Sequence, residues 1–363
     1  MKRWLKVGIA VAVSVISVGL AQKSSGTLTA IPVGYAPLLD GVASEDYWAK
    51  APVLEIATEG GGKWKAANKS ETSVRMRAVY TKDSMHLLLQ WKDPSYSIDR
   101  QRWGFDGKVW SKADQVPLDK GGANTLYEDK LALLWVINAP SVVEAGDFWP
   151  LYVAPDDAAK HGYNRPVKAA PKGETLDMWH WKLVRNGFTI PAQVDDQYVD
   201  SSLDAKTFTE AGRKSDPQPA DQPGGYYNND KEFTAPDGTK VKGPKYYVPG
   251  NNNVYIITQD MIDRGQAKEI ADYPALMSLP AGTALPGVVG RPHTGSRGDI
   301  LGKATWRNGE YTLEISRKLN TGDAEHDVIF GDLSKRYYFG IAVFDNTQIG
   351  HGFSDLYELV FAK

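Results

Sequence analysis

The sequence predicts an all-β fold, a β-sandwich with long wrapping loops. Short runs in which apolar and polar residues alternate recur along the chain, and this is the pattern of half-buried strands. No long stretch has a convincing helical periodicity. Many short strands with little helix are typical of a sandwich.

The clearest strand pair is a hairpin over residues 74–80 and 85–91, joined by a turn at 82–84. A second hairpin turn is expected at Asn308-Gly309, because these residues tolerate the positive φ of a type I′ turn. Further strands are expected at 131–137, 176–184, 254–258, 311–316, 337–344 and 356–361, and a short helix within 258–269.

Residues 1–21 have the pattern of a secretory signal. Three basic residues precede an apolar stretch from Val7 to Leu20, and small residues end it. The stretch is short for a bilayer span. We therefore expect a periplasmic or secreted protein without stable membrane insertion; an uncleaved membrane anchor is the alternative.

The remaining chain is expected to form one domain over 35–363, after an N-terminal linker over 22–34. The segment from about 215 to 298 is rich in Pro, Gly, Asn and Asp, with only one or two strand-like runs. We interpret it as a long insertion wrapped on the sandwich, because the strands on either side look like parts of one fold. A linker between two domains is the alternative.

Composition excludes several classes of function. The formal net charge of -2 suggests neither a nucleic acid nor an anionic membrane as partner. The chain has no Cys, which excludes disulfides, thiolate metal sites, iron–sulfur clusters and covalently attached haem. We find no G-x-S-x-G, no H-E-x-x-H and no Gly-rich phosphate loop, so no catalytic residues are proposed.

Several strings carry a family resemblance. The opening D-G-x-x-x-E-x-x-W-x-x-A-P from Asp40 to Pro52 resembles both carbohydrate-binding modules of family nine and the haem-binding subunits of ethylbenzene dehydrogenase and its relatives. Four later strings, at 128–135, 177–182, 295–319 and 338–351, look in this order like the ethylbenzene dehydrogenase-related haem-binding family. The resemblance covers most of 35–363 and implies an immunoglobulin-like sandwich of the family-nine module type.

The resemblance also implies electron transfer. One kind of member is the haem b subunit of periplasmic molybdenum enzymes of the dimethyl sulfoxide reductase type, with iron held by Met and by Lys or His. The other kind carries a C-x-x-C-H haem c site. The corresponding place here, near 146–150, has neither Cys nor His. We therefore expect a non-covalent haem b.

In this interpretation the chain is not itself an enzyme. It is a free electron carrier or a non-catalytic subunit of an oxidoreductase, and its redox partner is a molybdenum-enzyme catalytic subunit or a cytochrome. Two alternatives stay open: a haem-free carbohydrate- or ligand-binding module of the family-nine type, and a structural subunit that supports a partner enzyme.

Candidate iron ligands follow from the same strings. Met178, His180 and Lys182 alternate with two Trp residues on one expected strand. If the Trp residues face the core, the other three share the opposite face, where Met178 or His180 could bind iron and Lys182 could pair with a haem propionate. His351 lies where the resemblance places the distal iron ligand, between two Gly residues that would let a macrocycle approach.

The other candidates are weighed against ordinary surface roles. Arg297, in a Gly-rich turn, suits bidentate binding of a propionate. His161 follows the vacant haem c position and is an alternative ligand. His86 is expected to be exposed on the polar face of its hairpin, and His293 and His326 are expected to be uninvolved loop residues.

Overall fold

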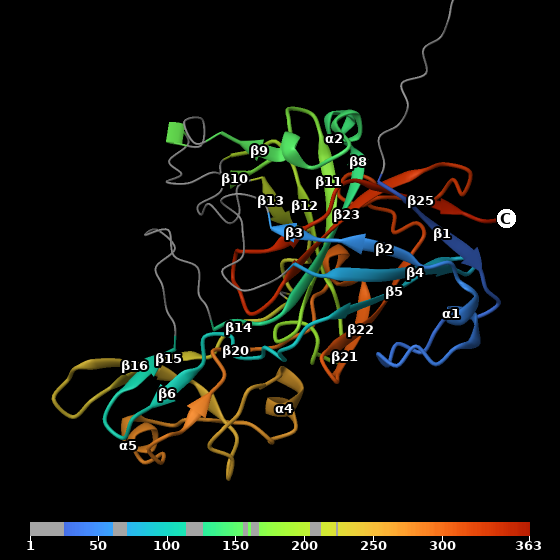
Figure 1. Ribbon diagram of the computed structural model, residues 1–363. Helices are drawn as coiled ribbons and strands as arrows, with labels where there is room; N and C mark the ends of the chain where they lie inside the picture. Colours follow the sequence, from blue (N-terminus) through green and yellow to red (C-terminus); the bar gives the residue numbers. More distant parts are fainter. Residues whose placement is uncertain are drawn as a thin grey trace, which may run out of the picture.

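The computed structural model describes residues 25–60, 71–113, 126–154, 159–160, 167–203, 212–222 and 224–363. It shows an all-β sandwich with a few short helices (Figure 1). The expected signal segment 1–21 and the candidate ligand His161 lie outside the described residues. Within the described ranges, no helix is both long and apolar enough to cross a membrane.

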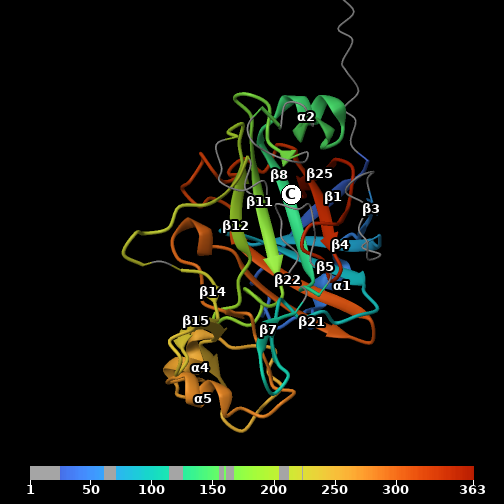
Figure 2. The same cartoon turned by 90° about the vertical axis from the view of Figure 1, so that its left-hand side faces the viewer.

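One 14-stranded sheet supplies both layers of the sandwich. Its path runs in the order β13 (Arg213–Ser215), β12 (Asp195–Val199), β11 (Thr175–Lys182), β8 (Lys130–Asn138), β23 (Tyr337–Phe344), β25 (Tyr357–Phe361), β1 (Thr27–Pro32), β4 (Ser73–Tyr80), β5 (Ser84–Lys92), β22 (Glu310–Lys318) and β21 (Leu301–Arg307). Off this path, β2 (Leu54–Ala57) pairs with β4, and β24 (Gly352–Phe353) pairs with β23 and β3 (Glu59–Gly60). Figure 2 shows β12, β11 and β8 side by side in one layer.

The expected strands are confirmed with one exception. The 74–80 and 85–91 runs form the antiparallel pair β4–β5. The turn before β22 has φ values of 53° at Asn308 and 78° at Gly309, as a type I′ turn requires. Residues 254–258 do not form a strand: Thr258 makes one isolated bridge to Gly290, and Val254 and Ile257 are buried within a loop. The expected short helix is α4 (Gln259–Asp263), whose first turn is capped by the side chain of Thr258.

The main core lies between the two layers. Trp179 and Trp181 of β11 are 1% and 0% exposed and point into it. The ring of Trp181 contacts Trp91 at 5.9 Å and Tyr311 at 5.6 Å between centroids, and these two residues belong to the opposite layer. The alternation of β11 therefore turns its other side chains away from the core.

The Asp40–Pro52 motif contains a short helix. Trp48 is buried, but it lies on the short helix α1 (Asp46–Lys50) and not on a strand. It packs with Tyr47 against Val79 and Leu88, on the outer face of β4 and β5. This small apolar cluster covers part of the outer face of the β4–β5 hairpin, so side chains on that face can be buried.

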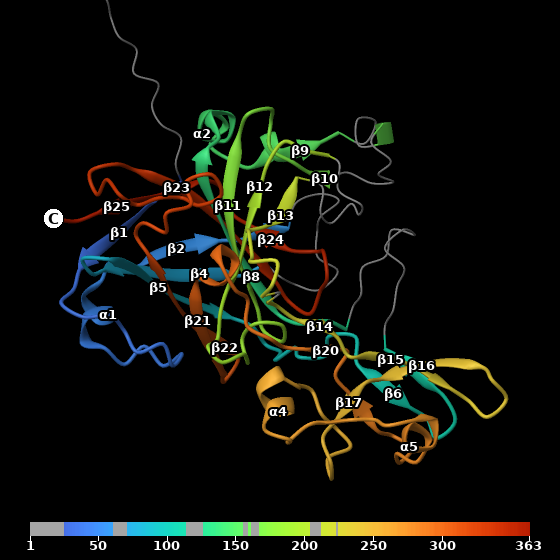
Figure 3. The same ribbon diagram turned by 180° about the vertical axis from the view of Figure 1, so that it is seen from behind.

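Most of residues 215–298 form a lobe at one end of the sandwich, together with β6 (Trp103–Phe105) and β7 (Trp110–Lys112) (Figure 3). Its elements are β14 (Tyr227–Asn228), β15 (Asp230–Thr234), β16 (Lys240–Pro244), β17 (Tyr246–Tyr247), α4, β18 (Lys268–Glu269), α5 (Tyr273–Met277), β19 (Ala284–Leu285) and β20 (Val288–Val289). The lobe has an apolar cluster of its own, which includes Trp103, Phe233 and Leu276. That the segment does not fold independently of the sandwich stays a prediction.

Short elements cover the outer face of β8 and β11 at the other end. They are α2 (Pro140–Ala145), the 3-10 helix η3 (Trp149–Leu151), β9 (Tyr152–Val153) and β10 (Val167–Lys168). A last 3-10 turn, η4 (Ser296–Gly298), precedes β21. Phe148 and Leu151 from this covering layer pack in a cluster with Leu176 and Val199.

Candidate functional site

A cavity of about 370 Å³ lies on the face of β8, β11 and β23 that points away from the core. Three rows of cross-strand neighbours form its floor: Met178–Leu134–Gly340, His180–Ala132–Ala342 and Lys182–Lys130–Phe344. In the middle row the imidazole stands beside two methyl side chains. Short side chains leave room above a sheet, which explains why a cavity forms here.

The sequence correctly placed three residues together. Met178, His180 and Lys182 share one face of β11 and all line the cavity, opposite the two buried Trp residues. His351, which follows β23 and directly precedes β24, lines the same cavity. Two candidate ligands far apart in the sequence therefore meet at one site.

His180 presents a free nitrogen in a buried place. Its Nδ1 lies 3.3 Å from Oε1 of Gln197, the neighbouring β12 side chain. Its Nε2 is buried and has no hydrogen-bond partner among the described residues. Burial, together with the charge of Lys182, holds the pKa of His180 well below its usual value. The ring is therefore neutral, and with Nδ1 donating to Gln197 the lone pair is on Nε2.

His351 has the same arrangement. Its Nδ1 donates to the carbonyl oxygen of Ile349 at 2.7 Å, so its Nε2 carries the lone pair. That Nε2 lies 3.5 Å from Nζ of Lys168. Burial lowers the pKa of His351 to about 3, so this imidazole is neutral at physiological pH.

Basic side chains surround one part of the cavity. Among the described residues, its lining includes no carboxylate but six basic residues: Arg100, Lys130, Lys168, Lys182, Arg185 and Arg213. Lys182 is paired with the buried Asp195 just outside the lining, and both Arg185 and Arg100 are paired with the buried Glu128. Burial lowers the pKa of Lys168 to about 8. A cavity with this lining favours a ligand that carries negative charge.

Arg297 lies near the cavity but not in it. Its guanidinium binds Asp195 through Nε at 2.6 Å and through Nη2 at 3.2 Å. It lines an adjoining polar depression that shares Lys182, Arg185 and Arg213 with the cavity. Its bidentate partner is thus a protein carboxylate. Arg213, which lines both the cavity and the depression, is better placed to contact a ligand.

One of the remaining His expectations is wrong. His86 is 1% exposed rather than solvent-exposed, because it shares the outer face of β5 with Leu88, which α1 covers. His293 is a loop residue that does not line the cavity, but it is 3% exposed and its Nε2 lies 3.4 Å from Asp195. His326 is a loop residue paired with Asp323 at 3.0 Å.

Several cavity residues were missed by sequence reasoning. Phe344 contacts both imidazoles, with centroids 5.6 Å from His180 and 4.7 Å from His351. Lys130 lies 4.0 Å from the Phe344 ring and donates to a backbone carbonyl. The signal was present in the small outward residues at 132, 340 and 342, which alternate with bulky core residues on two strands.

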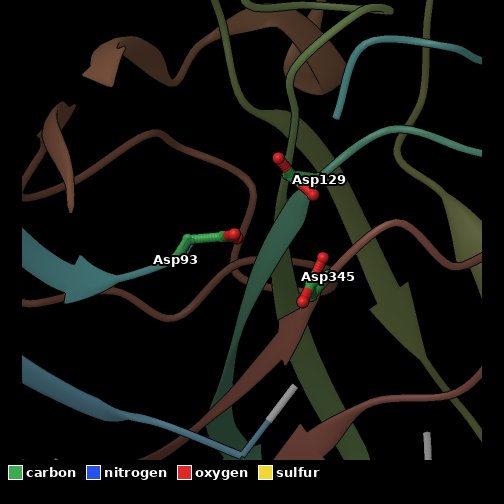
Figure 4. A group of neighbouring side chains, drawn as sticks. All are labelled: Asp93, Asp129 and Asp345. Carbon is green, nitrogen blue, oxygen red and sulfur yellow. The ribbon is translucent and has the colours of Figure 1, made fainter. Parts of the chain in front are cut away.

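Three buried carboxylates meet elsewhere, at one end of the sandwich. Asp93 follows β5, Asp129 precedes β8 and Asp345 follows β23, and Figure 4 shows their side chains turned toward one another. Tyr311 donates to Asp129 at 2.7 Å, and Ser95 donates to Asp345 at 3.1 Å. These hydrogen bonds give the cluster a structural role at the strand ends.

A profile of the family described as ethylbenzene dehydrogenase matches residues 45–355. The chain belongs to the ethylbenzene dehydrogenase family. This confirms the resemblance drawn from the sequence strings, and membership in this family is consistent with an oxidoreductase-associated subunit. No curated protein matches the sequence significantly.

Solved structures show distant likeness only. One is a protein from Bacteroides uniformis ATCC 8492 described as carbohydrate-binding, with a TM-score of 0.36, 10% identity, and coverage of 94% of this chain and 100% of that chain. Another is a family-nine carbohydrate-binding module from Caldicellulosiruptor kristjanssonii in complex with glucose, with a TM-score of 0.31, 8% identity, and coverage of 93% and 95%. At these values the likeness says nothing of what this member of the ethylbenzene dehydrogenase family binds.

Proposed function

We propose that this chain binds one b-type haem non-covalently in the cavity and passes single electrons to or from an oxidoreductase. The observation that carries the proposal is the buried Nε2 of His180. It has no hydrogen-bond partner among the described residues, and it lies on a cavity wall that His351 also lines. A buried polar atom without a partner is costly, and a bound metal would satisfy it.

The donor set fits haem iron. Electron-transfer haems use two strong axial donors, commonly His with His or Met. Both imidazoles are neutral, and both have Nδ1 within hydrogen-bond reach of a carbonyl oxygen, which is how proteins orient His ligands to metals. His180 and His351 would hold the iron, and Met178 is the further donor on the same wall. Without Cys, no thioether bond can form.

The rest of the lining also fits haem, a macrocycle with two propionate groups. Lys182 and Arg213 line both the cavity and the adjoining depression, so they would meet propionates at the place where these reach solvent. Apolar side chains would contact the ring: Leu134, Phe148, Leu151, Ile341, Phe344 and Phe353. Bound haem supplies one-electron chemistry, while the protein sets its potential through ligands, burial and nearby charge.

We further propose that the chain is exported from the cytoplasm and exchanges electrons with a partner protein. A haem b carrier needs a redox partner, which we take to be a molybdenum-enzyme catalytic subunit or a cytochrome outside the cytoplasm. No group of catalytic residues forms part of this proposal, so the chain acts as carrier or subunit.

An absorption spectrum tests the proposal. Full-length protein is exported from cells supplied with a haem precursor, purified and reduced with dithionite. We expect a Soret band and sharp α and β bands in the reduced form. Purified protein that stays colourless, and that does not take up added hemin, would overturn the proposal.

A further inference from the structure

A second set of buried charges lies on the opposite face of β11 and β12 from the cavity. It contains six carboxylates: Asp177 on β11, Asp196 on β12, Asp216 next to β13, Asp299 after η4, and Asp323 and Asp327 in the loop between β22 and β23. Asp177, Asp196, Asp216 and Asp327 are at most 3% exposed. None of the functional residues described above uses this cluster.

Positive charge within this cluster is scarce. Arg317 lies in its centre, with Nη1 3.1 Å from Asp177 and Nη2 2.8 Å from Asp327. The same guanidinium also lies near the carboxylates of Asp196 and Asp299. His326 lies at the edge of the cluster and pairs with Asp323 and Glu325. Buried carboxylates are costly unless they are paired, and one guanidinium does not balance the four buried ones, Asp177, Asp196, Asp216 and Asp327.

Asp216 supplies the decisive observation. It is 3% exposed, and both of its carboxylate oxygens are buried without a hydrogen-bond donor among the described residues. The group that faces it is another carboxylate, that of Asp327. A buried carboxylate that has no donor and faces a second carboxylate is costly, and a bound cation would satisfy both groups.

The geometry has room for an ion. One ligand oxygen from each of Asp216, Asp323 and Asp327 lies within 4.8 Å of the others. Calcium binds oxygen ligands at about 2.4 Å, so oxygens that share one calcium ion lie no more than about 4.8 Å apart. Thr321 donates to Asp327 and Ser296 donates to Asp323, which orients two of the three carboxylates.

We propose that Asp216, Asp323 and Asp327 bind one divalent cation of the calcium type. This ion joins the end of β13 to the loop between β22 and β23, and it leaves Arg317 to balance Asp177, Asp196 and Asp299. It would therefore hold the edge of the sheet whose other face contributes Arg213 to the cavity. The site does not depend on the haem proposal.

Thermal unfolding of the full-length protein tests the site. Protein freed of metal with a chelator is melted in calcium chloride, in magnesium chloride and in potassium chloride of equal ionic strength. With calcium at about 100 times its Kd, we expect the Tm to rise by roughly 5 °C. Asp216→Asn should remove this rise. The matched control is Asp93→Asn in the other carboxylate cluster (Figure 4), which should keep it.

Each result decides the matter. A wild-type Tm that is the same in all three salts overturns the proposal, and so does a calcium response that Asp216→Asn keeps and Asp93→Asn loses. If Asp216→Asn does not fold, Asp323→Asn at the more exposed edge takes its place, and equilibrium dialysis with labelled calcium on the wild type must give one bound ion.

Discussion

The ring of Phe344 stacks on the imidazole of His180, with 5.6 Å between centroids and 29° between planes. The same ring lies 4.7 Å from the imidazole of His351. One aromatic residue at the end of β23 thus contacts both candidate iron ligands, which reach the cavity from different elements.

Removing either imidazole should change the iron centre and leave the fold intact. For haem-loaded protein, His351→Ala and His180→Ala should each shift the iron from low spin to high spin or release the haem, because a strong axial donor is lost. Absorption and electron paramagnetic resonance spectra measure the spin state, and circular dichroism measures the fold.

The control for these variants is His326→Ala, because His326 does not line the cavity. His293 is unsuitable, since it is buried beside Asp195. An unchanged low-spin spectrum and haem content in His351→Ala would show that His180 and Met178, or another donor, form the axial set.

The haem should be fully extractable. Because the chain has no Cys, no thioether can link haem to protein. Acid–acetone treatment should move all colour into the organic phase, as a pyridine haemochrome assay of both phases would show. Colour that stays with the denatured protein would contradict non-covalent binding.

Breaking the buried pair between Arg185 and Glu128 should be far more damaging than breaking an exposed one. Glu128 is 0% exposed, so Arg185→Met leaves a buried carboxylate whose remaining guanidinium, on Arg100, has its Nε 3.5 Å away. We expect a loss of about 3 kcal/mol in the free energy of unfolding. Urea unfolding of the haem-free protein measures it.

The matched control is Arg75→Met. Its pair with Glu310 has side chains that are 39% and 32% exposed, and pairs of this kind contribute at most about 1 kcal/mol. Equal losses in the two variants would mean that burial of Glu128 does not set the energy of its pair.

His86 should make the protein sensitive to mild acid. Burial lowers its pKa to about 4 from 6.5, so between these values the unfolded chain binds a proton that the folded chain does not. Stability contributed by neutral His86 is therefore present above pH 6.5 and is lost as the pH falls toward 4.

The variant His86→Leu isolates this effect. From pH 7 to pH 5 it should lose about 2 kcal/mol less unfolding free energy than the wild type. At pH 7 it should be no less stable, because neither nitrogen of His86 has a hydrogen-bond partner among the described residues. Parallel pH profiles for the two proteins would show that His86 titrates normally in the fold.

The sequence by itself determined the strands and their faces. Alternation on β11 was enough to separate Trp179 and Trp181 from Met178, His180 and Lys182, because successive side chains of a strand must point to opposite faces. Asn308-Gly309 determined its turn because the local backbone demands a positive φ. These are short-range rules, and they need no knowledge of neighbours.

The tertiary structure alone decided which side chains are buried, which charged groups form ion pairs, and which residues distant in the sequence come together. His86 is buried because α1, from another part of the chain, covers its face of the hairpin. Arg297 forms an ion pair with Asp195, and no pattern in the sequence predicts this partner. The carboxylates around Arg317 come from five separate segments. Their negative charges therefore lie close together only once the chain has folded into the sheet.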